Sequence, residues 1–336
     1  MAETETIGLD AATDLIRRAL VASGVAETGA RLTAEALVAA EAEGQVGHGF
    51  SRLADYAAQV RTGKVRGDAV PKVTRPRPGT ILVDAGFGFA YPALDVAIRE
   101  GVAAADEVGT VAMAISRSHH CGALSIQVEK IAQAGCLGLM VANAPAAIAP
   151  WGAREAVFGT NPIAFGVPRP DGPPLVIDLS LSRVARGKVM HAKKSGTSIP
   201  EGWALDKDGN PTTDPEAALA GTMVPIGEAK GTALALMVEI LSAVFTGANL
   251  SINSGSFFTA EGDPPGTGQF LMAIKPADMT GFAARIEALL GHIESLEGAR
   301  LPGTRRLQAR AKSEAEGLNV PVNYLNIARE LAGSDG

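Results

Sequence analysis

The stretch that decides the fold reads Arg186-Gly-Lys-Val189, followed by Ile199-Pro-Glu-Gly-Trp-Ala-Leu-Asp-Lys-Asp-Gly-Asn-Pro-Thr-Thr-Asp-Pro215. Packing and turn formation can be satisfied by many sequences, so a run this dense in Gly, Pro, Asp and Trp indicates one particular architecture. Four other segments have the same character: Gly47-His-Gly-Phe-Ser-Arg52, Ser118-His-His-Cys-Gly122, Phe158-Gly-Thr-Asn-Pro162 and Gly227-Glu-Ala-Lys-Gly231.

The composition bounds the class of protein. The 336 residues are 46% apolar and 20% charged, which is typical of a soluble globular chain with a large core and two or three lobes. The formal net charge is −6. This charge argues against a nucleic-acid-binding protein, which needs a basic stripe to neutralise phosphates. An anionic small molecule would therefore require local positive charge.

Cysteine content and hydropathy indicate the compartment. Cys121 and Cys136 are the only cysteines, too few for a disulfide framework, so we expect a reducing environment. The acidic start of the chain lacks the apolar segment of a secretory signal. The longest apolar helix candidate, residues 232–245, is too short to span a bilayer and contains Glu239. We expect a cytoplasmic protein with no membrane partner.

Hydrophobic periodicity predicts an N-terminal helical part and then an α/β domain. Helical spacing occurs in residues 9–23, 30–43 and 51–61. Further along, strand-like and helix-like runs alternate, which predicts a sheet with helical cover. The expected strands are 80–84, 111–115, 137–141, 175–178 and 270–274, and the expected helices are 93–108, 123–134, 182–194, 232–245 and 279–292.

The connecting segments carry two further expectations. Residues 71–78 look like a linker, and residues 254–268 look like a mobile surface loop because they are polar, glycine-rich and long. No strand–turn–helix unit contains Gly-x-Gly-x-x-Gly. The nearest match, Gly86-Phe-Gly88, lacks the third glycine, so a Rossmann cofactor site is disfavoured.

His48 and Arg52 are the first candidate for chemistry. If their segment opens a helix, positions i and i+4 share one face. Arginine can then clamp a carboxylate while histidine handles a proton nearby. A surface histidine beside a solvated arginine has the same spacing, and spacing alone favours that reading.

The segment from Ser118 to Gly122 stands between a strand and a helix, where free backbone N–H groups can receive phosphate. A metal site built on His119, His120 and Cys121 is disfavoured, because adjacent histidines on one turn diverge and no second cluster completes a coordination shell. Cys121 is expected to be a small buried filler.

Three more positions are chemically suggestive. Thr160 could bind a carboxylate oxygen, or serve ordinary turn chemistry. Lys230 opposes the macrodipole at a helix N-terminus, which suggests a cofactor phosphate or a neighbouring carboxylate as partner. Arg305 and Arg306 could grip a 2′-phosphate, favouring NADP over NAD, or could be a solvated helix start.

Taken together, these segments resemble the malate/L-lactate dehydrogenase family of NAD(P)-dependent oxidoreductases over about residues 8–330. The resemblance implies an α/β, non-Rossmann, sulfolactate dehydrogenase-like fold, a mixed sheet with helical N-terminal and C-terminal parts. It also implies a homodimer with the active site at the subunit contact. The implied organisation is 1–75 for the helical part with the catalytic His and Arg, 76–115 for a shared sheet region, 116–295 for the NAD(P)-binding domain, and 296–336 for a segment returning to the first part.

The resemblance also implies roles for individual residues. His48 matches the family's proton donor, and Arg52 and Thr160 match residues that bind the substrate carboxylate. The segments expected along the cofactor contain His120, Cys121, Gly122, Ala123, Leu124, Asp178, Leu179, Ser180, Arg186, Gly187, Lys230, Gly303, Arg305 and Arg306. No metal is implied.

Within the family, His119-His120 followed by Ala123-Leu124 resembles the Δ1-piperideine-2-carboxylate/Δ1-pyrroline-2-carboxylate reductases. That branch has a Ser before the catalytic His and an Asp in the region of residues 186–188. Here those positions hold Gly47 and Lys188, so the Ser-His-Asp relay is missing. A lysine at this place resembles the malate, lactate and diketogulonate branches instead.

The sequence therefore predicts an enzyme that moves a hydride between a nicotinamide cofactor, NADP(H) with NAD(H) as the alternative, and the carbon next to a carboxylate. The first expectation is reduction of cyclic ketimine carboxylates to L-pipecolate or L-proline. The alternative is a 2-hydroxyacid dehydrogenase, and a remote alternative is an inactive nucleotide-binding protein.

Overall fold

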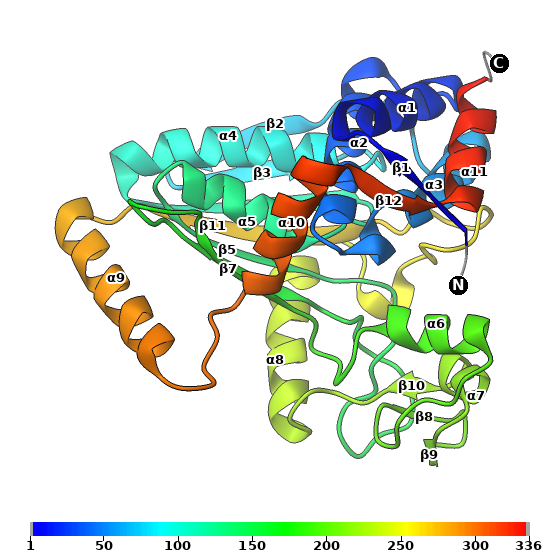
Figure 1. The fold of residues 1–336 in the computed structure, drawn as a ribbon. Coiled ribbons are helices and arrows are strands. Elements are labelled where there is room, and N and C mark those ends of the chain that lie inside the picture. The colour runs from blue at the N-terminus through cyan, green and yellow to red at the C-terminus, as the bar shows by residue number, and fades with distance from the viewer. Residues whose placement is uncertain (1–2, 334–336) are drawn as a thin grey trace.

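A seven-stranded mixed sheet runs through the middle of the molecule (Figure 1). The computed structural model describes residues 3–333. Only the β3–β4 pair is parallel within this sheet, and every other neighbouring pair is antiparallel. In sheet order the strands are β2 (Lys72–Arg77), β3 (Thr80–Asp84), β4 (Thr110–Ser118), β11 (Thr267–Ile274), β5 (Leu137–Ala142), β6 (Ile163–Val167) and β7 (Leu175–Leu179).

Alternation along the central strands sends apolar side chains to both faces of the sheet, as expected for strands covered on two sides. On one face, Met113, Met140 and Leu271 are buried under α4 (Ala90–Val108) and α5 (Leu124–Gln133). On the other face, Val141 and Phe270 pack with α8 (Ala229–Glu239), which continues as a π-helical segment, η3 (Ile240–Val244).

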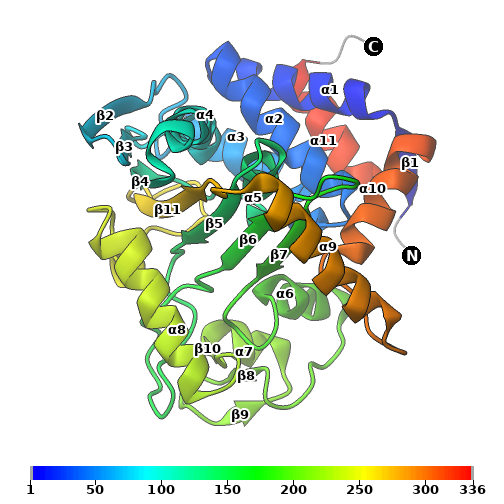
Figure 2. The same cartoon turned by 90° about the vertical axis from the view of Figure 1, so that its left-hand side faces the viewer.

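Both ends of the chain contribute to one helical part beside this sheet, as Figures 1 and 2 show. Helices α1 and α2 pack with the C-terminal helix α11, and strand β1 pairs antiparallel with β12. Residues 1–2 and 334–336 of the expected organisation lie outside the described residues. The elements of this part are β1 (Thr4–Ile7), α1 (Leu9–Ala22), α2 (Glu27–Ala42), η1 (Val46–His48), η2 (Phe50–Arg52), α3 (Leu53–Arg61), α10 (Thr304–Glu316), β12 (Leu318–Pro321) and α11 (Val322–Ala332).

The stretch quoted first builds a small lobe on the far side of the sheet from these helices. Its tight turn follows from Asp206, whose Oδ1 accepts the backbone N–H groups of Asp208 and Asn210, both at 2.9 Å, while Gly209 takes φ +84°. The Asp214 side chain then caps the next helix. The elements are α6 (Arg186–Ser195), β8 (Ala204–Leu205), β9 (Pro211–Thr212), α7 (Pro215–Ala220) and β10 (Thr222–Met223).

Two segments complete the description. Helix α9 (Met279–Ser295) projects from the body in Figure 1, and the 2.7 Å ion pair between Arg169 and Glu287 ties it back. A short 3-10 turn, η4 (Ser251–Asn253), follows α8 and η3. Within residues 3–333, no helix has both the length and the apolar content to cross a membrane.

The linker expected at 71–78 is wrong, because Lys72–Arg77 forms the edge strand β2. Its proline, Pro76, lies at the register shift between Thr74 and Arg77, where an edge strand tolerates a missing N–H donor. The loop expected at 254–268 also ends earlier, since Thr267 begins β11.

Candidate active site

His48 and Arg52 lie on two successive 3-10 turns, rather than on one continuous helix as their spacing suggested. The turns break at Gly49, because the Glu41 carboxylate occupies the space where a Cβ would stand. Glu41 Oε2 also accepts the Phe50 N–H at 2.9 Å. Arg52 folds back so that its Nε donates to the Gly47 carbonyl at 2.8 Å. The break therefore still leaves the imidazole and the guanidinium in one short segment.

The His48 ring stacks on that of His120, with centroids 5.3 Å apart and an interplanar angle of 21°. His120 Nδ1 is 2.6 Å from the hydroxyl of Tyr56, which in turn is 3.2 Å from that of Tyr91. Burial, and secondly the charge of Arg52, lower the pKa of His48 to about 4. The chain alone therefore holds His48 as a neutral imidazole at pH 7.

His119, next in the chain, is almost fully buried and its ring packs between Phe89 and Phe257. Burial lowers its pKa to about 3. Its backbone carbonyl accepts hydrogen bonds from Thr267 and Gln269, which fix the end of β4 against β11. Over residues 3–333, no group of three His, Cys, Asp or Glu side chains is arranged to hold a metal ion.

The N-terminus of α5 is shaped by Gly122, at φ +67°, where a Cβ would crowd the Tyr91 hydroxyl. Cys121, Ala123 and Leu124 are buried beneath this turn, and burial raises the pKa of the Cys121 thiol to about 12. Such a thiol is a packing residue, as expected.

Asp178, at the end of β7, completes this helix start. Its carboxylate accepts the Ser125 N–H at 2.8 Å, and desolvation by surrounding protein raises its pKa to about 6. The expected cofactor residue Leu179 is exposed beside it, and the Ser180 hydroxyl lies 3.1 Å from that of Ser182.

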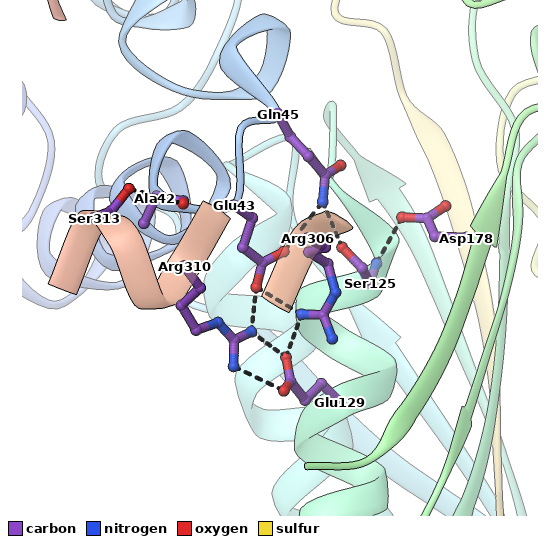
Figure 3. Close-up of polar contacts among 9 residues, drawn as sticks. All are labelled: Ala42, Glu43, Gln45, Ser125, Glu129, Asp178, Arg306, Arg310 and Ser313. Carbon is purple, nitrogen blue, oxygen red and sulfur yellow. Dashed lines mark hydrogen bonds and ion pairs between the residues drawn. The ribbon is translucent and has the colours of Figure 1, made fainter. Parts of the chain in front are cut away.

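Arg306 lies in a buried ionic cluster, which Figure 3 shows. Its Nη1 donates to Glu43 and Glu129, both at 2.7 Å, and Arg310 contacts the same two carboxylates. Nη1 of Arg306 is therefore engaged inside the protein, and its Nε and Nη2 are buried without a partner in the described chain, which argues against a cofactor phosphate as its ligand. Arg305 is exposed, and Gly303 takes φ +81° at the start of α10.

The same cluster connects the helix before His48 with the N-terminus of α5. Gln45 Nε2 donates to Glu43 at 3.1 Å and to the Ser125 hydroxyl at 2.8 Å, as Figure 3 shows. Helix α10, which carries Arg306 and Arg310, thus stabilises the relative placement of two candidate site segments.

Replacing Arg306 by methionine is expected to lower the free energy of unfolding by about 3 kcal/mol, because two buried carboxylates then share only Arg310. Urea denaturation followed by circular dichroism measures this loss. Arg305→Met, on the exposed neighbour, should stay within about 0.5 kcal/mol of the wild type. Equal stabilities of the two variants would show that the cluster contributes nothing.

A second set of candidates lies on the two segments that leave a short antiparallel pairing of residues 181–183 with 224–226. Leu181 N–H donates to the Thr160 carbonyl, Arg183 N–H to Val224, and Ile226 N–H back to Leu181, each at 2.8 Å. Helices α6 and α8 each begin three residues beyond this pairing, at 186 and 229. Because the two segments run antiparallel, α6 leaves one end of this pairing and α8 the other, and the backbone of Thr160 is bound at the Leu181 end.

The first turns of α6 and α8 carry three cations that have no acidic partner within the described part of the chain. Arg186 is half-buried, its pKa is lowered by desolvation, and its one hydrogen bond reaches the Leu219 carbonyl at 3.4 Å. Lys188 and Lys230 are exposed, and none of the three forms an ion pair within the described part of the chain. Gly187, between the first two, is exposed as well. Each of these cations can therefore pair with an anionic ligand.

The structure thus groups His48 with Arg52 and His120, whereas Arg186 and Lys188 lie on α6 and Lys230 lies on α8. Sequence reasoning missed Glu41, Tyr56 and the aromatic residues that surround His120. Tyr56 follows Arg52 by four positions, a signal that could have been used, whereas Phe257 approaches from far along the chain.

Proteins of known activity with similar sequences identify the family of this chain. A family model described as malate/L-lactate dehydrogenase matches residues 7–327. The chain is 48% identical over 329 residues to the (2R)-3-sulfolactate dehydrogenase (NADP(+)) of Chromohalobacter salexigens, with 98% of each chain covered. It is 39% identical over 333 residues to the Delta(1)-pyrroline-2-carboxylate/Delta(1)-piperideine-2-carboxylate reductase of Pseudomonas syringae pv. tomato, covering 98% of this chain and 97% of that one.

Solved structures agree. Delta1-piperideine-2-carboxylate reductase from Pseudomonas syringae superposes with a TM-score of 0.93 at 39% identity, covering 98% of this chain and 100% of the other. Sulfolactate dehydrogenase from Methanocaldococcus jannaschii gives a TM-score of 0.89 at 29% identity, covering 97% and 96%. The expected family and fold class are confirmed: this chain belongs to the malate/L-lactate dehydrogenase family and is an oxidoreductase with that family's α/β fold.

Proposed function

We propose that the chain is an NADP-dependent 2-hydroxyacid dehydrogenase whose substrate carries a second anionic group, as 3-sulfolactate and malate do. The observation that carries this proposal is Lys188, an exposed cation with no acidic partner in the described chain, at a place where the resemblance implies an Asp for the ketimine reductases. The 48% identity to a sulfolactate dehydrogenase supports the same choice. This preference reverses the order that the sequence alone suggested.

The residues present fit a phosphorylated dinucleotide. Arg186 is desolvated yet lacks an acidic partner in the described chain, and it opens the first turn of α6. Lys230 stands in the first turn of α8, which leaves the other end of the pairing of residues 181–183 with 224–226. These cations would hold the phosphates. A bound nicotinamide supplies or accepts the hydride.

The overall reaction balances as 2-oxo acid plus NADPH plus one proton, giving 2-hydroxy acid plus NADP⁺. In the oxidative direction neutral His48 takes the hydroxyl proton, and in the reductive direction the imidazolium returns it to the carbonyl oxygen. Arg52 and Thr160 hold the carboxylate, and Lys188 attracts the second anion. A bound carboxylate partly cancels the Arg52 charge, which removes one of the two causes that lower the His48 pKa.

Reduction of cyclic ketimine carboxylates is the second candidate. It is favoured by the relatives at about 39% identity and by the 0.93 TM-score to a piperideine-2-carboxylate reductase. Gly47 bears on this choice, because a Cβ there would meet no heavy atom within 4 Å. A serine can therefore be introduced at position 47 without displacing a neighbour.

The test is NADPH oxidation with 3-sulfopyruvate, oxaloacetate, pyruvate and the two cyclic imines. We expect the doubly charged oxo acids to exceed the imines at least about tenfold in kcat/KM. Lys188→Met should lower kcat/KM about tenfold for these oxo acids and less than about threefold for pyruvate, as loss of one exposed charge contact predicts. The matched control is Lys207→Met, on an exposed lysine of the β8–β9 turn.

The imine reading predicts the opposite ranking, with activity rising further in the Gly47→Ser/Lys188→Asp double variant. No turnover of any member of the panel, despite NADPH binding, would contradict both readings.

The exterior of α8 and η3 supports a homodimer. One side of this helix packs on the sheet, while its other side exposes large apolar side chains that a monomer leaves in water. They are Leu234, Leu236, Met237, Ile240, Val244 and Phe245. We propose that a second copy of the chain covers this face, in the cytoplasm, where Cys121 and Cys136 stay reduced.

Light scattering coupled to gel filtration is expected to give the mass of two 34.4 kDa chains. Ile240→Glu, which buries a charge in the proposed contact, should shift the protein to one chain. Lys312→Glu, on the outside of α10, should leave the dimer intact. A wild-type mass of one chain at micromolar concentration would refute the proposal.

A further inference from the structure

The segment 254–266, expected to be mobile, is fastened to the end of α3. Gln59 Nε2 donates to the carbonyls of Phe257 and Thr259, both at 3.0 Å. Lys64 Nζ donates to the Thr259 carbonyl at 2.9 Å, the Thr259 hydroxyl at 3.1 Å and the Glu261 carbonyl at 3.0 Å. This part of the loop is therefore held by about as many hydrogen bonds as a strand of similar length.

Lys64 is unusual because it is only 4% exposed and yet donates its three hydrogen bonds to neutral oxygens of the loop. Removing an ammonium from water is costly, so a buried lysine usually serves a particular arrangement. Here the arrangement is the path of residues 257–261.

That path delivers two consecutive aromatic rings to the candidate active site. The Phe257 ring lies 5.4 Å from the ring of His119 and 5.0 Å from that of His120, the stacking partner of His48. The centroid of the Phe258 ring lies 4.6 Å from the guanidinium carbon of Arg52. A cation over an aromatic face is held by the ring quadrupole.

The Phe258 ring remains 42% exposed, so part of it still faces open space beside Arg52. The guanidinium is held on three sides, because Phe258 covers one face, the Gly47 carbonyl accepts from Nε, and Asp55 Oδ2 lies 3.7 Å from Nη1, so the ring limits the directions from which a carboxylate can reach the Nη groups. Phe258 thereby also forms a wall against which the body of a small carboxylate lies.

We propose that Lys64 is a positioning residue, which fastens residues 257–261 so that Phe258 orients Arg52 and Phe257 supports His120, and that Phe258 is a specificity-determining residue. The proposal rests on the proposed role of Arg52 in binding the substrate carboxylate. It does not depend on which member of the substrate panel is turned over.

The experiment compares Lys64→Met, Phe258→Ala and Phe258→Tyr in the full chain. For the best substrate of the panel, Lys64→Met and Phe258→Ala should each raise KM about tenfold, with kcat changed less than about threefold and NADPH affinity unchanged. Phe258→Tyr keeps the aromatic ring, so its KM should return from the raised value of Phe258→Ala to that of the wild type. Lys72→Met, on an exposed lysine of β2, is the control for loss of a charge.

Amide hydrogen exchange provides a readout that needs no substrate. In Lys64→Met, residues 254–266 should exchange at least about tenfold faster than in the wild type, whereas Phe258→Ala should leave their exchange unchanged. If the panel yields no substrate, the proposed function fails while this measurement still tests the anchor. Unchanged exchange refutes the anchoring, and faster exchange with an unchanged KM refutes the positioning role. Should Lys64→Met fail to fold, Phe258→Ala, an exposed position, decides the specificity role.

Discussion

Replacing His48 by alanine is expected to lower kcat about a thousand-fold while leaving NADPH affinity within about threefold. General acid–base catalysis by one positioned side chain contributes roughly 10²–10⁴ in rate. In the described site this side chain is His48, which stacks on His120 and lies in the same short segment as Arg52. His120 cannot easily substitute, because its Nδ1 is engaged by the Tyr56 hydroxyl at 2.6 Å. The measurement is steady-state kinetics beside NADPH fluorescence titration.

His292→Ala is the matched control, since His292 is exposed near the end of α9 and should keep wild-type kinetics. Equal losses in rate and in NADPH affinity for His48→Ala would instead identify a structural role for this residue.

The pH dependence follows from the same group with a definite sign. Because burial lowers the His48 pKa to about 4, the neutral base is already present throughout pH 5–8. The value of kcat/KM reports the protonation state of the free enzyme. For oxidation of the hydroxy acid, the titration of His48 should leave kcat/KM flat over this range and lower it below pH 4. For reduction, which needs the imidazolium, kcat/KM should decline as pH rises. An acidic limb near pH 6.5 for oxidation would contradict the desolvation of His48.

The sequence predicted the elements whose pattern is local. Strand β3 begins and ends at the predicted residues, and helices α1 and α4 lie within three residues of their predicted bounds. It missed β2 because the three prolines and three charged residues of segment 71–78 make an edge strand look like a linker. It gave no indication that β11 inserts between β4 and β5, since strand order depends on packing between distant segments.

The same division applies to the site. Spacing, strengthened by the family resemblance, led to His48 and Arg52, which the structure keeps together on adjacent turns. It gave no sign that Arg306 pairs inside the protein, because Glu43 and Glu129, which accept hydrogen bonds from its Nη1, lie more than 170 positions earlier in the sequence. Lys64 gave no signal either, since its partners are 195 and 197 residues away and are mostly backbone carbonyls.

Replacing Arg52 by alanine is expected to lower kcat/KM for carboxylate substrates about a thousand-fold, mostly through KM. Removing one partner of a desolvated charge pair costs roughly 2–5 kcal/mol, and a thousand-fold loss corresponds to about 4 kcal/mol. Arg52 suits this role because its side chain is only 13% exposed and its charge already depresses the pKa values of His48, His119 and His120. Its guanidinium is the nearest cation to His48 in sequence and is fixed by the Gly47 carbonyl.

Arg52→Lys separates charge from geometry. Lysine retains the positive charge but loses the planar fork and the Nε donor that binds the Gly47 carbonyl, so it should recover no more than about tenfold of the loss. Arg61→Ala, on the exposed end of α3, controls for a missing arginine. Full recovery in Arg52→Lys would show that the charge alone attracts the substrate, and that neither bidentate binding nor the Phe258 wall is needed to orient it.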